Sequence, residues 1–138
     1  ANLSEEELGR VELCGLAWGE PLPRQARGPD LVLASECVYD LGLVEPLVAT
    51  LAELLAGGRA VALAGFDRAV GRSVAYAAFE ARCRERFESC EAVECEGARY
   101  RSDSCVVYAL ARPRTGCGDA GDRAPAETDG SADGQSRR

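Results

Sequence analysis

The feature that most constrains the fold is an amphipathic, helix-length segment between two short apolar runs. Residues 43–56 carry apolar side chains at spacings of three and four, which predicts a helix with one broad apolar face. The flanking runs, residues 31–35 and 59–66, have the length and composition of strands, and the first is interpreted as a strand that is buried on both faces. Gly57 and Gly58 are expected to end the helix. This strand–helix–strand unit predicts a parallel sheet with a right-handed crossover, and therefore an α/β fold.

Further elements are expected on both sides of this unit. They are a short helix after Ser4, a strand at 11–16, a helix at 70–87, and strands at 90–95 and 104–111. A turn at 96–101 should join the last two strands into an antiparallel hairpin. No large apolar residue occurs from Pro113 onward. We therefore expect residues 1–112 to form the folded domain and residues 113–138 to be a disordered tail.

Two polar side chains follow the apolar run at 31–35. Glu36 comes directly after it, and Tyr39 comes three residues later. Because open α/β sheets bind ligands at the carboxyl ends of their strands, both side chains are expected to project toward a site. The alternative is that Glu36 has only a structural role in the loop that leads to the next helix. The pattern alone leaves both interpretations open.

The net charge and the amino-acid composition limit which partners and which catalytic mechanisms are possible. The net charge of −7 and the pI near 4.7 argue against a nucleic-acid surface, which would be basic, and suit a basic protein partner. All 16 basic residues are arginine, and the chain has neither histidine nor lysine. This composition excludes mechanisms that need a histidine or lysine base from this chain.

The seven cysteines form no C-x-x-C pair. Without histidine, this spacing argues against a zinc site, so we expect no metal. We interpret the cysteines as free thiols of a reducing compartment, which predicts a cytoplasmic or also nuclear location. No apolar run approaches the roughly 20 residues that span a bilayer, so no membrane partner is expected. The start at Ala1, without methionine or signal peptide, suggests that the beginning of a longer protein precedes it.

Three segments carry motifs that occur in the same order in one protein family. Residues 16–20, Leu-Ala-Trp-Gly-Glu, resemble the L-x-W-G segment of the seven-strand methyltransferases that modify lysines in non-histone proteins. Residues 33–39, Leu-Ala-Ser-Glu-Cys-Val-Tyr, resemble their acid-x-x-aromatic motif at the end of strand four. Residues 45–51, Glu-Pro-Leu-Val-Ala-Thr-Leu, repeat the E-P-L-x-x-T-L pattern of the helix that follows. The likeness covers approximately residues 10–112.

A weaker likeness concerns the end of the domain. Residues 100–103, Tyr-Arg-Ser-Asp, lie before a strand that ends in Val107 and Tyr108. This arrangement is similar to the member group that methylates the valosin-containing AAA ATPase. The resemblance therefore implies a protein substrate with an exposed lysine, such as a chaperone or an AAA ATPase.

The resemblance implies a Rossmann-like methyltransferase sheet, mostly parallel with a C-terminal antiparallel hairpin. It also implies a protein-lysine methyltransferase that uses S-adenosylmethionine. The indole of Trp18 would lie near the adenine, and Ala34 and Ser35 would line the cofactor. Glu36 and Tyr39 would face the substrate amine as the catalytic residues. The family more often has aspartate at the position of Glu36, whose carboxylate extends one methylene further.

The family binds its cofactor through a glycine-rich turn after strand one and an acid at the end of strand two. We find neither beside the predicted strands. Gly15 and Gly19 do not form a G-x-G-x-x-G turn after a strand, and Gly65 follows what would be strand five. We therefore expect the N-terminal strands one and two to be missing. The strand at 31–35 would then be an uncovered apolar edge, and S-adenosylmethionine would bind weakly or not at all.

Three functions stay open at this point. The first is an enzyme, or part of one, that methylates lysine. The second is a non-catalytic protein-binding remnant that kept the substrate-facing half of a methyltransferase domain. The third is a domain of another transferase in which Glu36 is structural. Replacement of Glu36 by alanine separates the third from the first, because a catalytic residue loses turnover while the fold survives.

Overall fold

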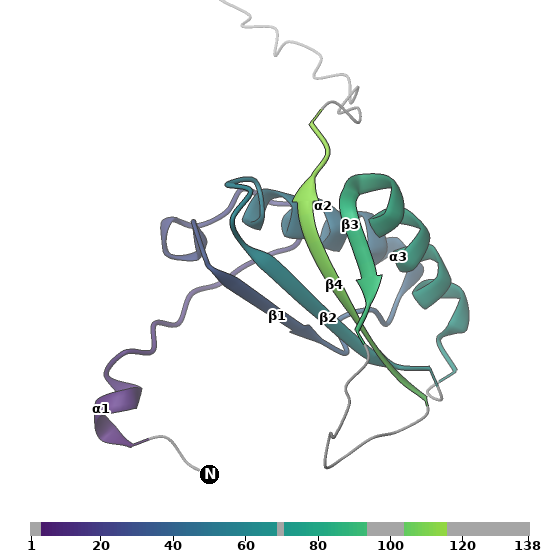
Figure 1. Cartoon of the computed structure of the whole chain (residues 1–138). Coiled ribbons are helices and arrows are strands. Elements are labelled where there is room, and N and C mark those ends of the chain that lie inside the picture. The colour runs from purple at the N-terminus through teal and green to yellow at the C-terminus, as the bar shows by residue number, and fades with distance from the viewer. Residues whose placement is uncertain (1–3, 69–70, 94–103, 116–138) are drawn as a thin grey trace, which may run out of the picture.

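The computed structural model of the chain describes residues 4–68, 71–93 and 104–115. Four strands form one sheet in the order β1-β2-β4-β3 (Figure 1). Their bounds are Leu31–Ser35 for β1, Val61–Asp67 for β2, Phe87–Ala92 for β3 and Cys105–Pro113 for β4. β1 and β2 are parallel, as the strand–helix–strand unit predicts, and β4 is antiparallel to both β2 and β3. Because β4 lies between β2 and β3, only one of the three pairings among the described strands is parallel, so the described part of the sheet is not mostly parallel as expected.

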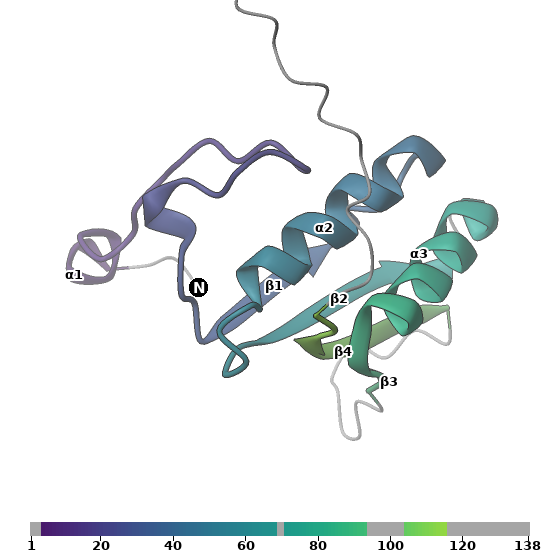
Figure 2. The ribbon, with the colours of Figure 1, turned by 90° about the horizontal axis from the view of Figure 1, so that it is seen from above.

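Two helices cover one face of this sheet (Figure 2). They are α2, Val44–Leu54, and α3, Ser73–Arg86, and they pack against each other. The short helix α1, Glu5–Leu8, and the single 3-10 turns η1, Arg24–Ala26, and η2, Leu41–Leu43, complete the described helical elements. The helices expected at 43–56 and 70–87 and the strands expected at 31–35 and 59–66 are therefore confirmed, with shifts of up to three residues at their ends.

Local chemistry explains where α2 begins and ends. The carboxylate of Asp40 accepts a hydrogen bond from the Gly42 N–H at 2.7 Å and starts the turn that leads into the helix. Pro46 falls in the first turn of the helix, where a backbone N–H would have no partner within the helix. Proline, which has no N–H, is therefore tolerated there. Gly58 adopts a φ of +71° and donates its N–H to the Leu55 carbonyl at 2.9 Å. This left-handed cap is favourable for glycine, so the chain can turn back into β2.

The two faces of the sheet differ sharply in exposure. On β2, Ala62, Ala64 and Phe66 are buried beneath the helices. On the opposite face, Leu31 and Leu33 of β1 are 53% and 72% exposed. The prediction that this strand is buried on both faces is therefore wrong, because only the face under the helices is covered. The expectation of an apolar edge strand is confirmed among the described residues, where β1 pairs only with β2.

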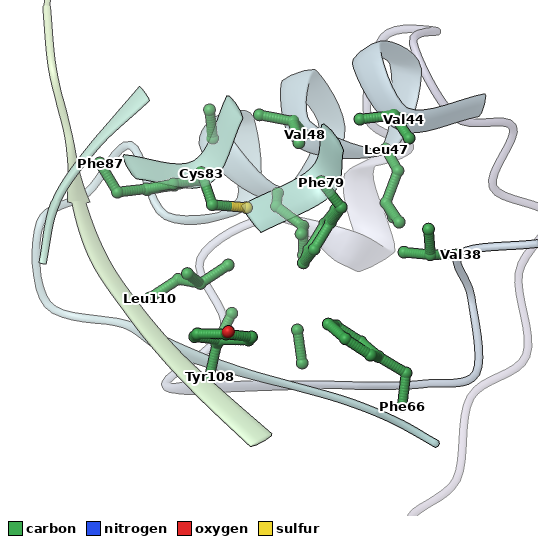
Figure 3. Close-up of a cluster of buried hydrophobic side chains, with 14 of the residues drawn as sticks. Val38, Val44, Leu47, Val48, Phe66, Phe79, Cys83, Phe87, Tyr108 and Leu110 are labelled. Atoms are coloured by element: carbon green, nitrogen blue, oxygen red, sulfur yellow. The ribbon is translucent and has the colours of Figure 1, made fainter. Parts of the chain in front are cut away.

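The core lies between the sheet and the two helices. Side chains from both layers point toward one another there (Figure 3). The largest fully buried ones are Leu51, Leu55, Phe79, Cys83, Phe87 and Leu110. Burial of this kind contributes about 1.5–3 kcal/mol per large side chain, so the α2–α3–sheet contact is the main source of stability.

The strand predicted at 11–16 is absent, and that prediction is wrong. Residues 11–16 form no strand, and Leu13 is 91% exposed. The alternation of Val11 and Leu13 suits a strand, but a strand also needs a neighbour to satisfy its backbone groups. No described segment pairs with this stretch, so the local pattern has no sheet to join.

The C-terminal hairpin is confirmed as an antiparallel pair, but β3 begins three residues earlier than predicted. It starts at Phe87, directly after the last residue of α3. The turn expected at 96–101 lies outside the described residues. So does the tail from residue 116 onward, while Pro113 itself is the last residue of β4 rather than the first of a tail.

Candidate functional site

Glu36 occupies a special backbone position where β1 ends. Its φ is +55°, in the left-handed region that non-glycine residues rarely adopt. Its N–H donates to the Gly65 carbonyl at 2.9 Å, which extends the pairing of β1 with β2 by one more bond. The turn directs the side chain back toward the end of β2. Strained positions of this kind are often found at functional sites.

The carboxylate of Glu36 makes different contacts through its two oxygens. Oε1 accepts the backbone N–H of Asp67 at 2.5 Å. Oε2 accepts the hydroxyl of Tyr76 at 3.3 Å and lies 3.9 Å from a guanidinium nitrogen of Arg72. Because the Glu36 side chain is still 44% exposed, Oε2 can accept a further donor from solvent or a ligand.

Tyr76 is a site residue that the sequence analysis does not name. Its ring is buried and stacks on Phe66 with 4.3 Å between centroids. Burial, and then the neighbouring Glu36 carboxylate, raise the pKa of the Tyr76 phenol above its ordinary value, so it stays protonated and able to donate. No local signal links a residue of α3 to the end of β1, because the two are 40 positions apart.

Trp18 and Tyr39 come together, although 21 positions separate them. Their ring centroids lie 6.1 Å apart with a 49° tilt, which is within the range of aromatic pairs. Trp18 packs against the edge of the core, and Tyr39 is largely exposed. The two sequence-predicted aromatics therefore lie side by side, and most of the Tyr39 side chain remains accessible.

Gly19 explains how the Trp18 segment is held. Its N–H donates to Oγ1 of Thr50 at 2.8 Å, and that hydroxyl donates in turn to the Pro46 carbonyl at 3.0 Å. Gly19 has a φ of +84°, and a Cβ there would lie 3.3 Å from the Cβ of Pro46. The W-G segment and the E-P-L-x-x-T-L helix thus pack directly against each other. Only glycine permits this close approach without strain.

Ala34 and Ser35 lie on opposite faces of the sheet, because successive side chains of a strand alternate. Ala34 is half-buried against the core, and Ser35 is exposed on the other face. They cannot line one surface with both side chains, so only their backbone could do so together.

Two cavities lie at opposite ends of the parallel strands. The larger, about 610 Å³, is lined by residues before β1 and β2, including Arg27, Asp30 and Arg59. The smaller, about 320 Å³, lies at the carboxyl end of β2 and is lined by Phe66, Arg68, Ser73, Tyr76, Ala77 and Glu80. Since Tyr76 borders it and also contacts Glu36, the smaller cavity adjoins the candidate site.

Other kinds of site find no support in the part of the chain that the structure describes. Residues 4–68, 71–93 and 104–115 contain no cluster of three or more potential metal ligands. No helix among these residues is long and apolar enough to cross a membrane.

One glycine pattern escaped the sequence interpretation. Gly116, Gly118 and Gly121 have the G-x-G-x-x-G spacing and follow a strand. The motif also needs a helix directly after it, and the following residues have no apolar face to form one. These glycines lie outside the described residues, so no site is assigned to them.

The sheet and the contacts of Glu36 with Asp67, Arg72 and Tyr76 define an α/β protein. Its candidate site lies where the parallel strands end. A family model described as lysine methyltransferase matches residues 2–76, which is 75 of the 138 residues. The chain belongs to this lysine methyltransferase family. The match includes Trp18, Glu36 and Tyr39 and ends at Tyr76. No curated protein matches the chain.

Proposed function

We propose that this chain transfers a methyl group from S-adenosylmethionine to a lysine side chain of a protein substrate. The observation that carries the proposal is the half-exposed side chain of Glu36, presented at the carboxyl end of β1 in a chain of the lysine methyltransferase family. In this proposal Glu36 receives the substrate amine, and Tyr39 forms an aromatic wall beside it.

Lysine chemistry explains why a carboxylate suits this position. A free lysine has a pKa near 10.4 and arrives as a cation, whereas only the neutral amine attacks an electrophilic methyl. Glu36 attracts the ammonium, accepts its hydrogen bond and orients the lone pair once a proton has left to solvent. Most of the rate gain comes from this positioning and from exclusion of water. A chain without histidine or lysine is compatible with this mechanism, because no strong base is required.

The residues present fit one end of the cofactor. Trp18 and Tyr39 offer an aromatic surface of the kind that stacks on an adenine or lies against a positively charged sulfonium. When bound, S-adenosylmethionine would supply the electrophilic methyl. Ala34 and Ser35 could contribute backbone contacts beside it. A partner for the ribose hydroxyls is not identified among the described residues.

The acidic surface suggests what the substrate looks like. With a net charge of −7, the chain should attract a lysine within a basic, exposed segment and speed the encounter. A chaperone or an AAA ATPase, and a cytoplasmic or nuclear location, remain our proposals for the partner and the compartment.

Substitution of Glu36 tests the proposed function most directly. The chain is incubated with tritiated S-adenosylmethionine, at a saturating concentration, and a total protein extract. The Glu36→Gln variant keeps an oxygen for the Asp67 N–H but loses the charge, so we expect at least tenfold less transfer, about 1.4 kcal/mol, with the fold intact. No transfer by the wild-type chain, together with no heat of cofactor binding in calorimetry, would contradict the proposal and favour the non-catalytic remnant.

A further inference from the structure

The two oxygens of Glu36 are held by different means. Oε1 is fixed by the main chain, through the Asp67 N–H at 2.5 Å. Among the described residues, Oε2 is contacted by two side chains, through the Tyr76 hydroxyl at 3.3 Å and the Arg72 guanidinium at 3.9 Å. The direction of the oxygen that faces a ligand therefore depends on those two side chains.

Of the two neighbours, Tyr76 is the more buried and the more closely packed. Its side chain is 3% exposed, its ring stacks on Phe66, and its N–H is bonded to the Arg72 carbonyl at 3.0 Å within the first turn of α3. Arg72 is more than a third exposed, and its contact with Glu36 is long for an ion pair. A buried, immobile donor can fix the direction of a carboxylate, whereas an exposed arginine fixes it poorly.

We propose that Tyr76 is a positioning residue for lysine binding and methyl transfer. Its hydroxyl donates to Oε2 of Glu36 and holds that oxygen so that its remaining lone pair accepts from the substrate amine. This inference rests on the proposed function, because it assumes that Glu36 receives the amine. Tyr76 itself does not touch the substrate.

Tyr108 provides a matched control. It is also 3% exposed, and it also packs on Phe66, with centroids 5.9 Å apart. Its hydroxyl contacts Arg68 at 3.1 Å and Glu80 instead of Glu36. Tyr76→Phe and Tyr108→Phe therefore each remove one hydroxyl from the same core, and only the first removes a partner of Glu36.

The experiment measures amine binding without requiring turnover. The full chain, labelled with ¹⁵N, is titrated with n-butylammonium chloride, and the Asp67 amide reports the state of the carboxylate bonded to it. Sodium chloride and n-butanol control for ionic strength and for the alkyl chain. We expect saturable shifts in the wild type and the Tyr108→Phe variant, and a dissociation constant roughly threefold to tenfold higher in Tyr76→Phe.

The outcomes separate this inference from the proposed function. Equal affinity in Tyr76→Phe and wild type, equal losses in both variants, or no amine-dependent shift in the wild type would overturn the role of Tyr76. In the tritium assay, Tyr76→Phe should lower kcat while the KM for S-adenosylmethionine stays unchanged, and an unchanged kcat would likewise overturn it. Amine binding that depends on Tyr76 in a chain without methyl transfer would support the positioning of Glu36 and contradict only the proposed methyl transfer.

Discussion

Glu36 links β1 to β2 and α3 through hydrogen bonds, and its side chain is also partly exposed to solvent. Its main chain bonds to Gly65, and its side chain bonds to Asp67 and Tyr76. The structural and the functional interpretations of this residue are therefore compatible. A substitution has to be chosen so that it separates the two roles.

Replacement by alanine and by glutamine should affect stability differently. Glu36→Ala leaves the Asp67 N–H without its acceptor, so the free energy of unfolding should fall by about 1 kcal/mol. Glu36→Gln retains an acceptor and should lose less than half of that. Urea denaturation of both variants measures the difference. Equal losses would show that the charge, rather than the hydrogen bond, provides the stabilisation.

The raised pKa of Tyr76 gives stability a defined pH dependence. The folded state binds the phenol proton more tightly than the unfolded state, whose pKa is close to 10.0. The stability associated with this proton is therefore fully present below about pH 10 and is lost as the pH rises further. Tyrosine ¹³Cζ titration should show that the pKa of Tyr76 is above the ordinary tyrosine value. Glu36→Gln should lower the Tyr76 midpoint, and an unchanged midpoint would exclude their interaction.

The residues named for the site from the sequence follow local patterns, and those missed depend on long-range contacts. Glu36 and Tyr39 are identified because they follow an apolar run. The donors to Glu36, at Asp67 and Tyr76, are 31 and 40 positions away. Only the assembled sheet brings them together, so no pattern within a single segment could name them.

At the level of elements, α2 serves as the support for the Trp18 segment. The chain from Trp18 to Leu22 follows this helix, through Gly19 to Thr50 and through the Leu22 N–H to Glu53 at 3.4 Å. Trp18 and Tyr39 can then meet, because the loop after β1 also leads into the same helix. The geometry of the aromatic pair therefore depends on α2.

Substitution of Gly19 should loosen this contact. In Gly19→Ala the left-handed backbone and the close approach to Pro46 should lower the free energy of unfolding by about 1–2 kcal/mol. The freed indole should also shift the tryptophan emission to longer wavelength. Gly15→Ala is the matched control, because no atom lies within 4 Å of a Cβ built there. Equal effects in both variants would contradict the role of Gly19.

Elements with strong periodicity are predicted well, and those that depend on a partner are not. The pattern of residues 44–54 is enough to give α2, and the apolar run is enough to give β1. The stretch at 11–16 alternates at Val11 and Leu13, but it has no neighbour to pair with among the described residues. β3 begins too early for the prediction because α3 runs into it at Phe87 without any turn residue.

At the scale of the whole molecule, the described sheet has an edge strand, β1, with no further strand beside it among the described residues. β1 pairs only with β2 among the described strands, and its five residues include no charge and no proline. Leu31 and Leu33 lie on the uncovered face beside this edge. Natural proteins usually protect such edges, since unpaired backbone groups and apolar side chains together promote association.

Concentration-dependent association should therefore depend on β1. Leu33→Thr keeps a side chain suited to a strand but removes apolar surface, so it should reduce association in light scattering while the free energy of unfolding changes by less than about 0.5 kcal/mol. Leu41→Thr removes a similarly exposed leucine from η2, away from the edge, and serves as the control. Equal effects of the two would show that general hydrophobicity, rather than the edge, causes association.

The central place of β4 has a consequence for how the protein is made. This strand is the last described element to be synthesised, yet it is the one that bridges β2 and β3 and completes the core with Leu110. Until residues 105–113 emerge from the ribosome, β1 can pair with β2, but β3 has no partner among the described strands. Such distant pairing forms slowly and leaves aggregation-prone surface exposed in the meantime. A stop codon before residue 105 should therefore yield an insoluble product rather than a smaller folded one.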